Sequence, residues 1–201
     1  FELSQATAGA VGDSRGWLGY GGQLSSLTIN QTTPGVTQTV NINQLLEVGS
    51  RPVFNVTAGN LIVNVNGGGV GGGGLEWPTA SGDMTIPDGV TVNLNNAYFR
   101  SRPGVHGSGN LIIASGGKLA GVGTVGGTYD LTIAPGGTLE AGHGQLGLEM
   151  IYGNWLRWRG AISLPHADSE LVIGTSQWKY VEPVSADTAI SGEGILDLEP
   201  H

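Results

Sequence analysis

The chain is dominated by short runs in which apolar and polar residues alternate, which is the period of a β-strand with one buried face. The clearest run is written twice, over residues 110–121 and 130–142. Equivalent positions recur at a constant interval, so that Leu111 matches Leu131, and a Gly-Gly pair divides each copy into two apolar stretches. Glycine suits a turn because it adopts positive φ without a steric penalty. The unit therefore predicts a strand, a turn and a second strand.

The same pattern continues on both sides of this pair. Residues 83–92 repeat it with a turn shorter by one position, and Leu171 follows Leu131 at twice the interval, with Glu170 in the place of Asp130; Ile151 falls in the same phase. A unit of this length gains a full set of hydrogen bonds only by stacking on its neighbours. We therefore predict an all-β chain folded as a parallel β-solenoid with coils of roughly 20 residues, with a β-sandwich as the alternative. The expected inner file of core residues is Leu111, Ile113, Leu131, Ile133, Leu171 and Ile173.

Composition supports strands over helices. Of 201 residues 37 are glycine, more than twice the usual share, and charged residues make up only 12%. We expect one β-rich domain over residues 23–201, preceded by an irregular arm or cap at 1–22. Residues 41–48 form the only stretch that suits a short helix, and the glycine run 67–74 is expected to be a flexible loop, or alternatively a close-packed glycine layer. Residues 190–198 are expected to cover the open end of the stack.

The balance of charge excludes some partners. The net charge is −8, and the eight basic residues are spread along the chain. Without a cluster of Lys and Arg we expect neither nucleic acid nor an anionic membrane as a partner, and no apolar run is long enough for membrane insertion. The absence of cysteine excludes disulfides and thiolate chemistry, and it is compatible with a cytosolic, an exported or a virion protein. Phe1 is not an ordinary translational start, so we expect that processing or trimming preceded it.

Candidate chemistry is sparse, and we expect no catalytic residues, no bound metal and no cofactor. No two of the four histidines stand at metal-ligand spacing, and His143, between two glycines, is expected in a turn. His166, Asp168 and Glu170 recur with period 2, which predicts a solvated strand face, with a metal or acid–base site as the alternative. Three acids stand at the starts of coils and are expected to hold turns through hydrogen bonds. They are Asp83, Asp130 and Glu170.

A binding surface is better supported. Trp155, Arg157 and Arg159 would share one face of a strand, with Leu156 and Trp158 on the other. Trp and Arg are frequent anchors of interfaces, although the tryptophans could equally be packed in the core. The candidate binding residues are Trp155, Arg157, Arg159, Trp178 and Tyr180.

Two resemblances follow from these residues. Residues 110–144, with their repeated strand, Gly-Gly turn and second strand, resemble the passenger repeats of bacterial autotransporter adhesins. That likeness implies a parallel β-helix exported through a C-terminal membrane barrel, but here we expect no barrel and too few coils for a usual passenger. Residues 83–109 look like the Gly-rich receptor-binding and surface proteins of tailed bacteriophages. Neither likeness carries catalytic residues.

Together these observations predict a non-enzymatic structural protein of a bacteriophage-like particle, either a capsid decoration or a tail surface component. It would act by docking and self-assembly with protein partners, as a homo-oligomer, on a virion or at the cell surface. The alternative is a secreted or cell-surface adhesin domain that binds a glycan or another cell. A polysaccharide-processing enzyme is the third hypothesis.

Overall fold

The computed structural model describes residues 2–5, 24–43, 45–67, 73–77, 82–101, 110–127, 130–150, 154–174, 178–182 and 190–199. All secondary structure in these segments is β, as predicted, and within them no helix is long and apolar enough to cross a membrane.

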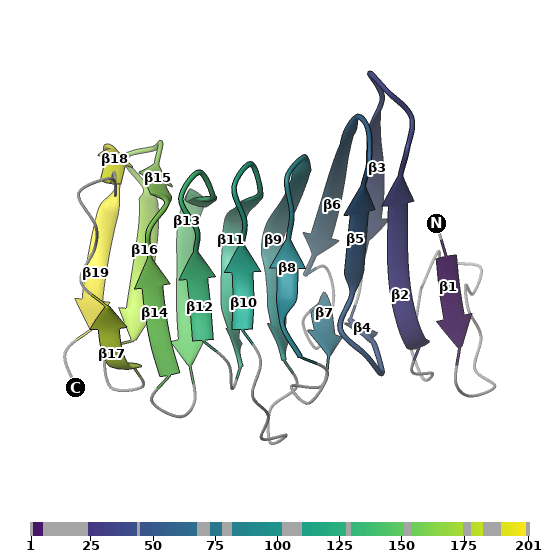
Figure 1. The fold of residues 1–201 in the computed structure, drawn as a ribbon. Coiled ribbons are helices and arrows are strands. Elements are labelled where there is room, and N and C mark those ends of the chain that lie inside the picture. The colour runs from purple at the N-terminus through teal and green to yellow at the C-terminus, as the bar shows by residue number, and fades with distance from the viewer. Residues whose placement is uncertain are drawn as a thin grey trace.

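The strands stack side by side in three rows along one axis (Figure 1). The first row contains β2 (Leu24–Gln31), β5 (Val53–Val56), β8 (Met84–Ile86), β10 (Asn110–Ile113), β12 (Asp130–Ile133), β14 (Asn154–Trp158) and β17 (Trp178–Glu182). The second row contains β3 (Thr37–Ile42), β6 (Asn60–Asn66), the first halves of β9 (Val90–Ser101), β11 (Lys118–Gly127) and β13 (Thr138–Met150), then β15 (Ala161–Leu164) and β18 (Ile190–Gly192). The third row contains β4 (Leu46–Glu47), β7 (Gly73–Trp77), the second halves of the same long strands, β16 (Ser169–Gly174) and β19 (Ile195–Glu199).

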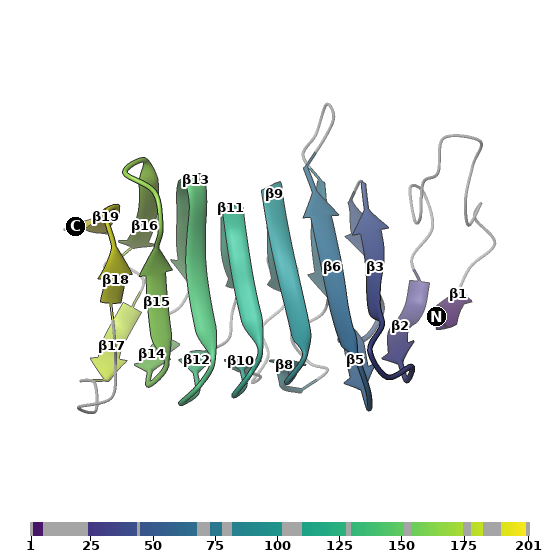
Figure 2. The same ribbon diagram turned by 90° about the horizontal axis from the view of Figure 1, so that it is seen from above.

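Neighbouring strands within a row are parallel. The one antiparallel pair in the described part of the chain joins β1 (Glu2–Gln5) to β2. In the view from above, the second-row strands succeed one another in chain order along the length of the molecule (Figure 2). The predicted parallel β-solenoid is confirmed, and the alternative of a β-sandwich is not, because a sandwich is built from antiparallel pairs.

The predicted inner file is the core. Leu111 pairs with Leu131 and Ile113 with Ile133 across β10 and β12, and all four side chains are fully buried. Leu171 and Ile173 are buried too. Burial of such a file, coil upon coil, supplies the main stabilisation of the stack.

The Gly-Gly turns form as predicted. The N–H of Gly137 donates to Ala134 across the turn at 2.8 Å, and Gly136 has a φ of 80°. A Cβ on Gly137 would collide with the carbonyl oxygen of Ile113 in the preceding coil. One glycine is thus required by its backbone conformation and the other by the close approach of two coils.

The coils are less regular than the sequence predicts. The spacing between Leu111 and its partner Leu131 matches the predicted coil length. The spacings from Met84 to its partner Leu111 and from Leu131 to its partner Leu156 are both longer. The assignment of Leu171 to the same row was wrong, because it pairs with Leu146 in the third row. Alternation with period 2 shows that a segment is a strand but does not show which row it joins.

Two local predictions also need correction. The described residues of 41–48 form no helix: β3 ends at Ile42, and β4 pairs with β7 so that Leu46 is buried. The end of the glycine run is not a loop: Gly73 and Gly74 belong to β7, and a Cβ on Gly74 would lie 2.6 Å from the carbonyl oxygen of Tyr98. That close packing supports the glycine-layer alternative for these two residues, whereas 68–72 lie outside the described residues.

The two ends of the chain also differ from expectation. β18 and β19 do not cover the stack but extend its second and third rows in register, which leaves Ile190 51% and Ile195 56% exposed. From the predicted arm, residues 2–5 form β1, and 6–22 lie outside the described residues, as does Ile151.

Candidate binding surface

The structure brings three of the predicted binding residues together on the last strands of the first row. β14 and β17 are parallel neighbours, and their register places Trp155 opposite Tyr180 and Asn154 opposite Trp178. The two strands belong to successive coils, so only the stacking of coils makes these positions neighbours. The backbone register alone places them, because the side chains of Trp155, Trp178 and Tyr180 lie outside the described part of the chain.

The core side of β14 is as predicted. Leu156 is fully buried and Trp158 is 8% exposed. The indole Nε1–H of Trp158 donates to the carbonyl oxygen of Gly160 at 3.0 Å, which satisfies its polar atom inside the stack. Trp158 is therefore a packing residue and not part of a binding surface.

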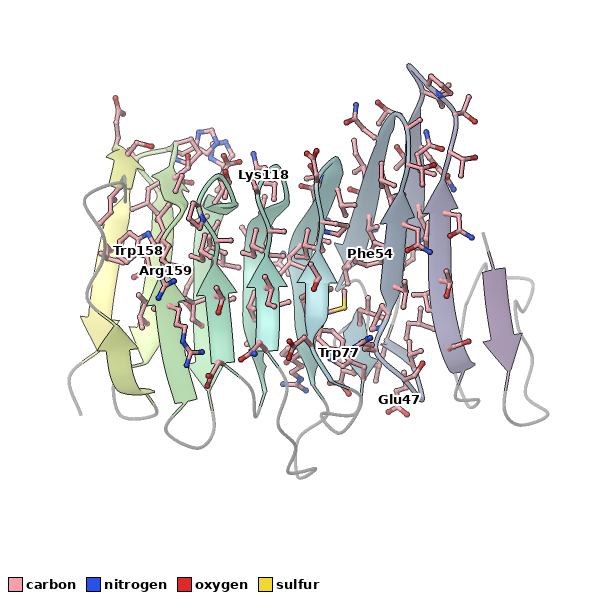
Figure 3. The ribbon with its side chains drawn as sticks, viewed as in Figure 1. Glu47, Phe54, Trp77, Lys118, Trp158 and Arg159 are labelled. Carbon is pink, nitrogen blue, oxygen red and sulfur yellow. The ribbon has the colours of Figure 1, made fainter. Side chains whose placement is uncertain are left out.

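The two predicted arginines, on β14 and in the turn after it, differ in environment. Arg157 donates from Nη1 to Asp130 Oδ2 at 2.6 Å and is half-buried, so its guanidinium is held against the neighbouring strand β12. Arg159 is exposed and lies at the front of the molecule (Figure 3). It lines a cavity of about 290 Å³ together with Pro135, Thr138 and the glycines of two stacked turns.

The acids at the starts of coils, which were expected to hold turns, make contacts with the neighbouring coils. Asp130 pairs with Arg157, and Asp83 Oδ1 accepts hydrogen bonds from the backbone N–H of Asn110 at 2.9 Å and from its side chain at 3.2 Å. Glu170 Oε2 accepts a bond from Gln145 at 3.2 Å. Each acid links one coil to the next, because outward side chains at equivalent positions are adjacent in a parallel ladder.

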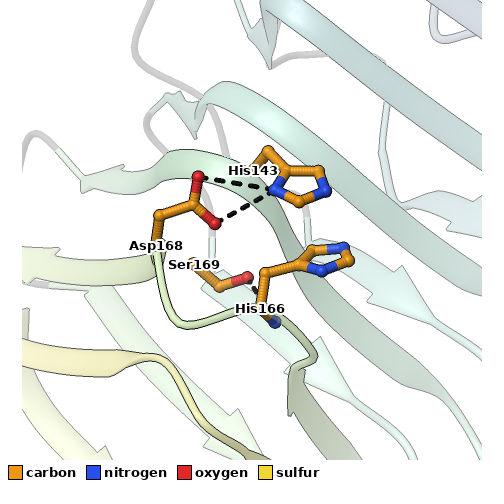
Figure 4. A network of polar contacts seen from close by, with 4 residues as sticks. All are labelled: His143, His166, Asp168 and Ser169. Carbon is orange, nitrogen blue, oxygen red and sulfur yellow. Dashed lines mark hydrogen bonds and ion pairs between the residues drawn. The ribbon is translucent and has the colours of Figure 1, made fainter.

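A cluster of polar groups forms at one corner of the stack (Figure 4). His143 Nδ1 lies 3.0 Å from Asp168 Oδ1, and the rings of His143 and His166 stack with centroids 3.6 Å apart. His143 lies within β13 and not in a turn, at a place where residues 142–145 bulge out of the register with β11. The bulge carries His143 towards the next coil, which supplies both partners.

This cluster links two coils. The hydrogen bond from His143 lowers the pKa of Asp168, although both side chains are largely exposed. Ser169 does not complete a nucleophilic triad, because it is fully buried and its Oγ accepts a bond from the N–H of His166 at 3.1 Å. Among the described residues no group of three or more His, Asp or Glu is placed to hold a metal ion.

Two ladders of asparagine run along the second row, and the sequence analysis missed them. The side-chain amide of Asn93 donates to Asn64 at 3.1 Å, and that of Asn64 donates to Asn41 at 2.8 Å. A second ladder runs beside it, from Asn95 through Asn66 to Asn43, at 3.4 and 2.8 Å. These amides face outwards, so they present a regular polar surface at the spacing of parallel strands, about 4.8 Å.

Two carboxylates occur at paired positions in the third row. Glu47 on β4 lies opposite Glu76 on β7, which in turn lies opposite Arg100 on β9. Glu76 is only 5% exposed, and its Oε1 accepts a bond from Arg100 Nε at 2.8 Å. The Arg100 guanidinium also lies 4.0 Å from the centre of the Tyr98 ring. Glu76 therefore serves as the partner of a buried ion pair.

No protein-family model, curated protein or solved structure matches this chain.

Proposed function

We propose that the protein is a non-enzymatic structural protein that docks end to end within a larger surface assembly, of the kind found on bacteriophage-like particles. The observation that carries this proposal is a difference in burial between the two ends of the second row. It concerns the apolar side chains that face the core. Val40 and Ile42, on the first strand of the second row, are 9% and 3% exposed. Ile190, which pairs with the buried Ile162 and continues the same file on β18, is 51% exposed.

An inward-facing apolar side chain on the last strand of a row remains exposed unless a further coil stacks against it. On β19 the inward-facing Leu196, the register partner of Leu171, is only partly buried, and the outward-facing Ile195 beside it is 56% exposed. Covering such side chains is favourable at about 25 cal/mol per Å². Exposed strand edges also pair readily with another chain. A second copy of this chain is the occupant that we propose, which makes the protein a homo-oligomer.

Sedimentation equilibrium over a range of concentrations tests this proposal. We expect a discrete oligomer or an open polymer for the unmodified chain and a monomer for the Ile190→Asp, Ile195→Asp double variant. Thr132→Asp, an outward position in the middle of the first row, is the matched control and should associate like the unmodified chain. A monomer at all concentrations would contradict the proposal.

A second candidate function, a surface adhesin that binds a glycan, has its own supporting observation. Register places Trp155 of β14 opposite Tyr180 of β17. Aromatic residues that stack on sugar rings suit glycan recognition. A glycan array tests it: binding that is lost in the Trp155→Ala, Tyr180→Ala double variant and kept in the Ile190→Asp, Ile195→Asp variant would favour the adhesin.

A further inference from the structure

The first row of strands is interrupted between β5 and β8. Strands β1, β2 and β5 form one sheet, and β8, β10, β12, β14 and β17 form another. Within the described residues β5 and β8 are not paired as strands, although the two strands lie side by side in the ribbon (Figure 1). Elsewhere in this row each described strand is paired with its neighbour.

A proline explains where the ladder fails. At the residue after four of the first-row strands, β5, β10, β12 and β14, a backbone N–H donates to a carbonyl of the preceding coil, at 2.8–3.0 Å. The donors are Thr57, Ala114, Ala134 and Arg159. Pro87 holds the equivalent position after β8 and has no N–H, so it cannot donate to Val56 in β5. The closing bond of the ladder between β5 and β8 is therefore missing.

Backbone groups of both strands face this break. In a parallel ladder successive residues direct their N–H and C=O groups to opposite neighbours. Thr57 bonds to β2, so Phe54 and Val56 direct theirs towards β8. The carbonyl of Ile86 is taken by Ala114, so Thr85 directs its groups towards β5.

A groove of about 170 Å³ lies over the break. Its lining combines polar and apolar residues, which are Arg51, Pro52, Val53, Phe54, Asp83, Thr85 and Pro87. Phe54, buried beneath it, is labelled in Figure 3. The groove thus combines apolar side chains with side chains that donate and accept hydrogen bonds.

The polar side chains of the groove keep hydrogen-bonding groups that the described part of the protein does not use. The Arg51 guanidinium lies close to Gly82 of the next coil, because a Cβ added to Gly82 would be 2.7 Å from its Nη1. Arg51 nevertheless has no hydrogen bond or ion pair among the described residues. Arg100 and Arg157, in contrast, both pair with a carboxylate. Asp83 uses Oδ1 for both of its bonds to Asn110, which leaves Oδ2 available. A donor and an acceptor therefore stand next to each other without pairing.

We propose that this groove binds one saccharide unit of a glycan. Arg51 donates to one hydroxyl, Asp83 accepts from a neighbouring hydroxyl, and Pro52, Phe54 and Pro87 contact the C–H face of the ring. The volume is well below the roughly 300 Å³ of the smallest drug-sized sites, so it suits one ring of a longer chain that continues over the surface.

The observations favour a sugar over a peptide strand. β-Strand addition needs an open edge with room for a whole strand. Here the two edges face each other, and the buried side chains of Phe54 and Met84 lie beneath the break, so a strand cannot enter without displacing core residues. The proposal is independent of the end-to-end docking and of the candidate residues at Trp155.

Titration of the ¹⁵N-labelled full chain with single sugars tests the proposal. The probes are neutral hexoses, N-acetylhexosamines and hexuronates, each added alone and followed by backbone amide shifts. We expect one class to shift the amides of Phe54, Val56 and Thr85 in a saturable manner. Arg51→Ala should weaken this binding about tenfold or more, and Asp83→Asn, which keeps the acceptor for Asn110, should weaken it similarly. Lys118→Ala, which removes a cation from the second row, should leave the affinity unchanged.

The outcomes separate the sites. If no sugar class shifts these amides, or if Arg51→Ala binds as tightly as the unmodified chain, the groove is not a saccharide site. Shifts confined to the amides of Trp155 and Tyr180 would overturn the groove and support the adhesin instead.

Discussion

His143 and Asp168 are joined across two coils by a hydrogen bond of 3.0 Å between Nδ1 and Oδ1. A second bond, from the backbone N–H of Gly144 to the carbonyl of Asp168 at 3.1 Å, fixes the same two corners. The bulge of β13 and the corner before β16 are thus held together by one side-chain and one backbone contact.

The first prediction concerns the titration of Asp168. Its pKa lies below the ordinary 3.8, chiefly because His143 donates to it. A carboxylate with a lowered pKa stabilises the fold above its unfolded pKa and loses that contribution as the pH falls through its folded pKa. The contribution of Asp168 is therefore complete at neutral pH and disappears only in acid, below about pH 4.

Carboxyl ¹³C shifts measured against pH check this prediction. His143→Ala should raise the pKa of Asp168, whereas His166→Ala, which removes a weaker influence, should raise it less. A pKa at or above 3.8 in the unmodified chain would refute the assignment of this hydrogen bond.

The second prediction concerns the inner file. Leu131→Ala should reduce the free energy of unfolding by about 2–5 kcal/mol, because it leaves a cavity between two coils. Leu131→Asp should prevent folding, since an unpaired charge would enter the core. Thr132→Ala, one residue along and facing outwards, should change stability by about 0.5 kcal/mol or less. Urea unfolding followed by circular dichroism measures all three, and a cooperatively folded Leu131→Asp protein would exclude the register described.

The third prediction separates two demands on glycine. Gly35 has a φ of 71° with open space around it, so Gly35→Ala should cost only about 1 kcal/mol for the left-handed conformation. Gly121 has a φ of 114°, and a Cβ there would overlap the carbonyl oxygen of Leu94. Gly121→Ala should cost distinctly more in the same unfolding measurement. Equal costs would show that the coils are not in close contact at Gly121.

The fourth prediction concerns the asparagine ladders. Asn64 lies in the middle of a ladder, so Asn64→Ala removes two amide bonds, at about 0.5–1.5 kcal/mol each. Asn55→Ala removes the single bond to Asn30 and should cost about half as much. Thermal unfolding of both variants checks the ratio. If Asn55→Ala proved the more costly, the two amide bonds of Asn64 would not stabilise the fold as described.

The fold was predictable because its dominant signal is local. The alternation around Leu111 and Leu131 and the Gly-Gly turns were sufficient to predict strands, coils and the residues of the core. The prediction failed at Leu171, because its strand has the same alternation as β12 but joins a different row. Which row a strand joins depends on the lengths of the corners, which vary from coil to coil.

The sites were less predictable because they depend on register. The spacing in sequence from Asn41 to Asn64 differs from that between Asn64 and Asn93, so no fixed period reveals the ladder before the strands are aligned. His143 and Asp168 meet only because β13 bulges.

Pro87 carried a signal that could have been used at the start. A proline directly after a strand removes a ladder bond, because it has no N–H to donate. Its effect became visible only beside Thr57 and Ala114, which make the bond that Pro87 lacks. The loss of a ladder bond at Pro87 was therefore predictable from the sequence, but the pair of strands that it separates was not.

The asparagine ladders also give the molecule a direction. In both files the amide N–H groups point towards β3, so that side of the array ends in the donor groups of Asn41 and Asn43. At the other side Asn93 and Asn95 are followed in register by Ala120 and Val122, which carry no amide. Among the described strands the two ends of these files therefore differ, since amide donors stand at the β3 end and apolar side chains follow the other end.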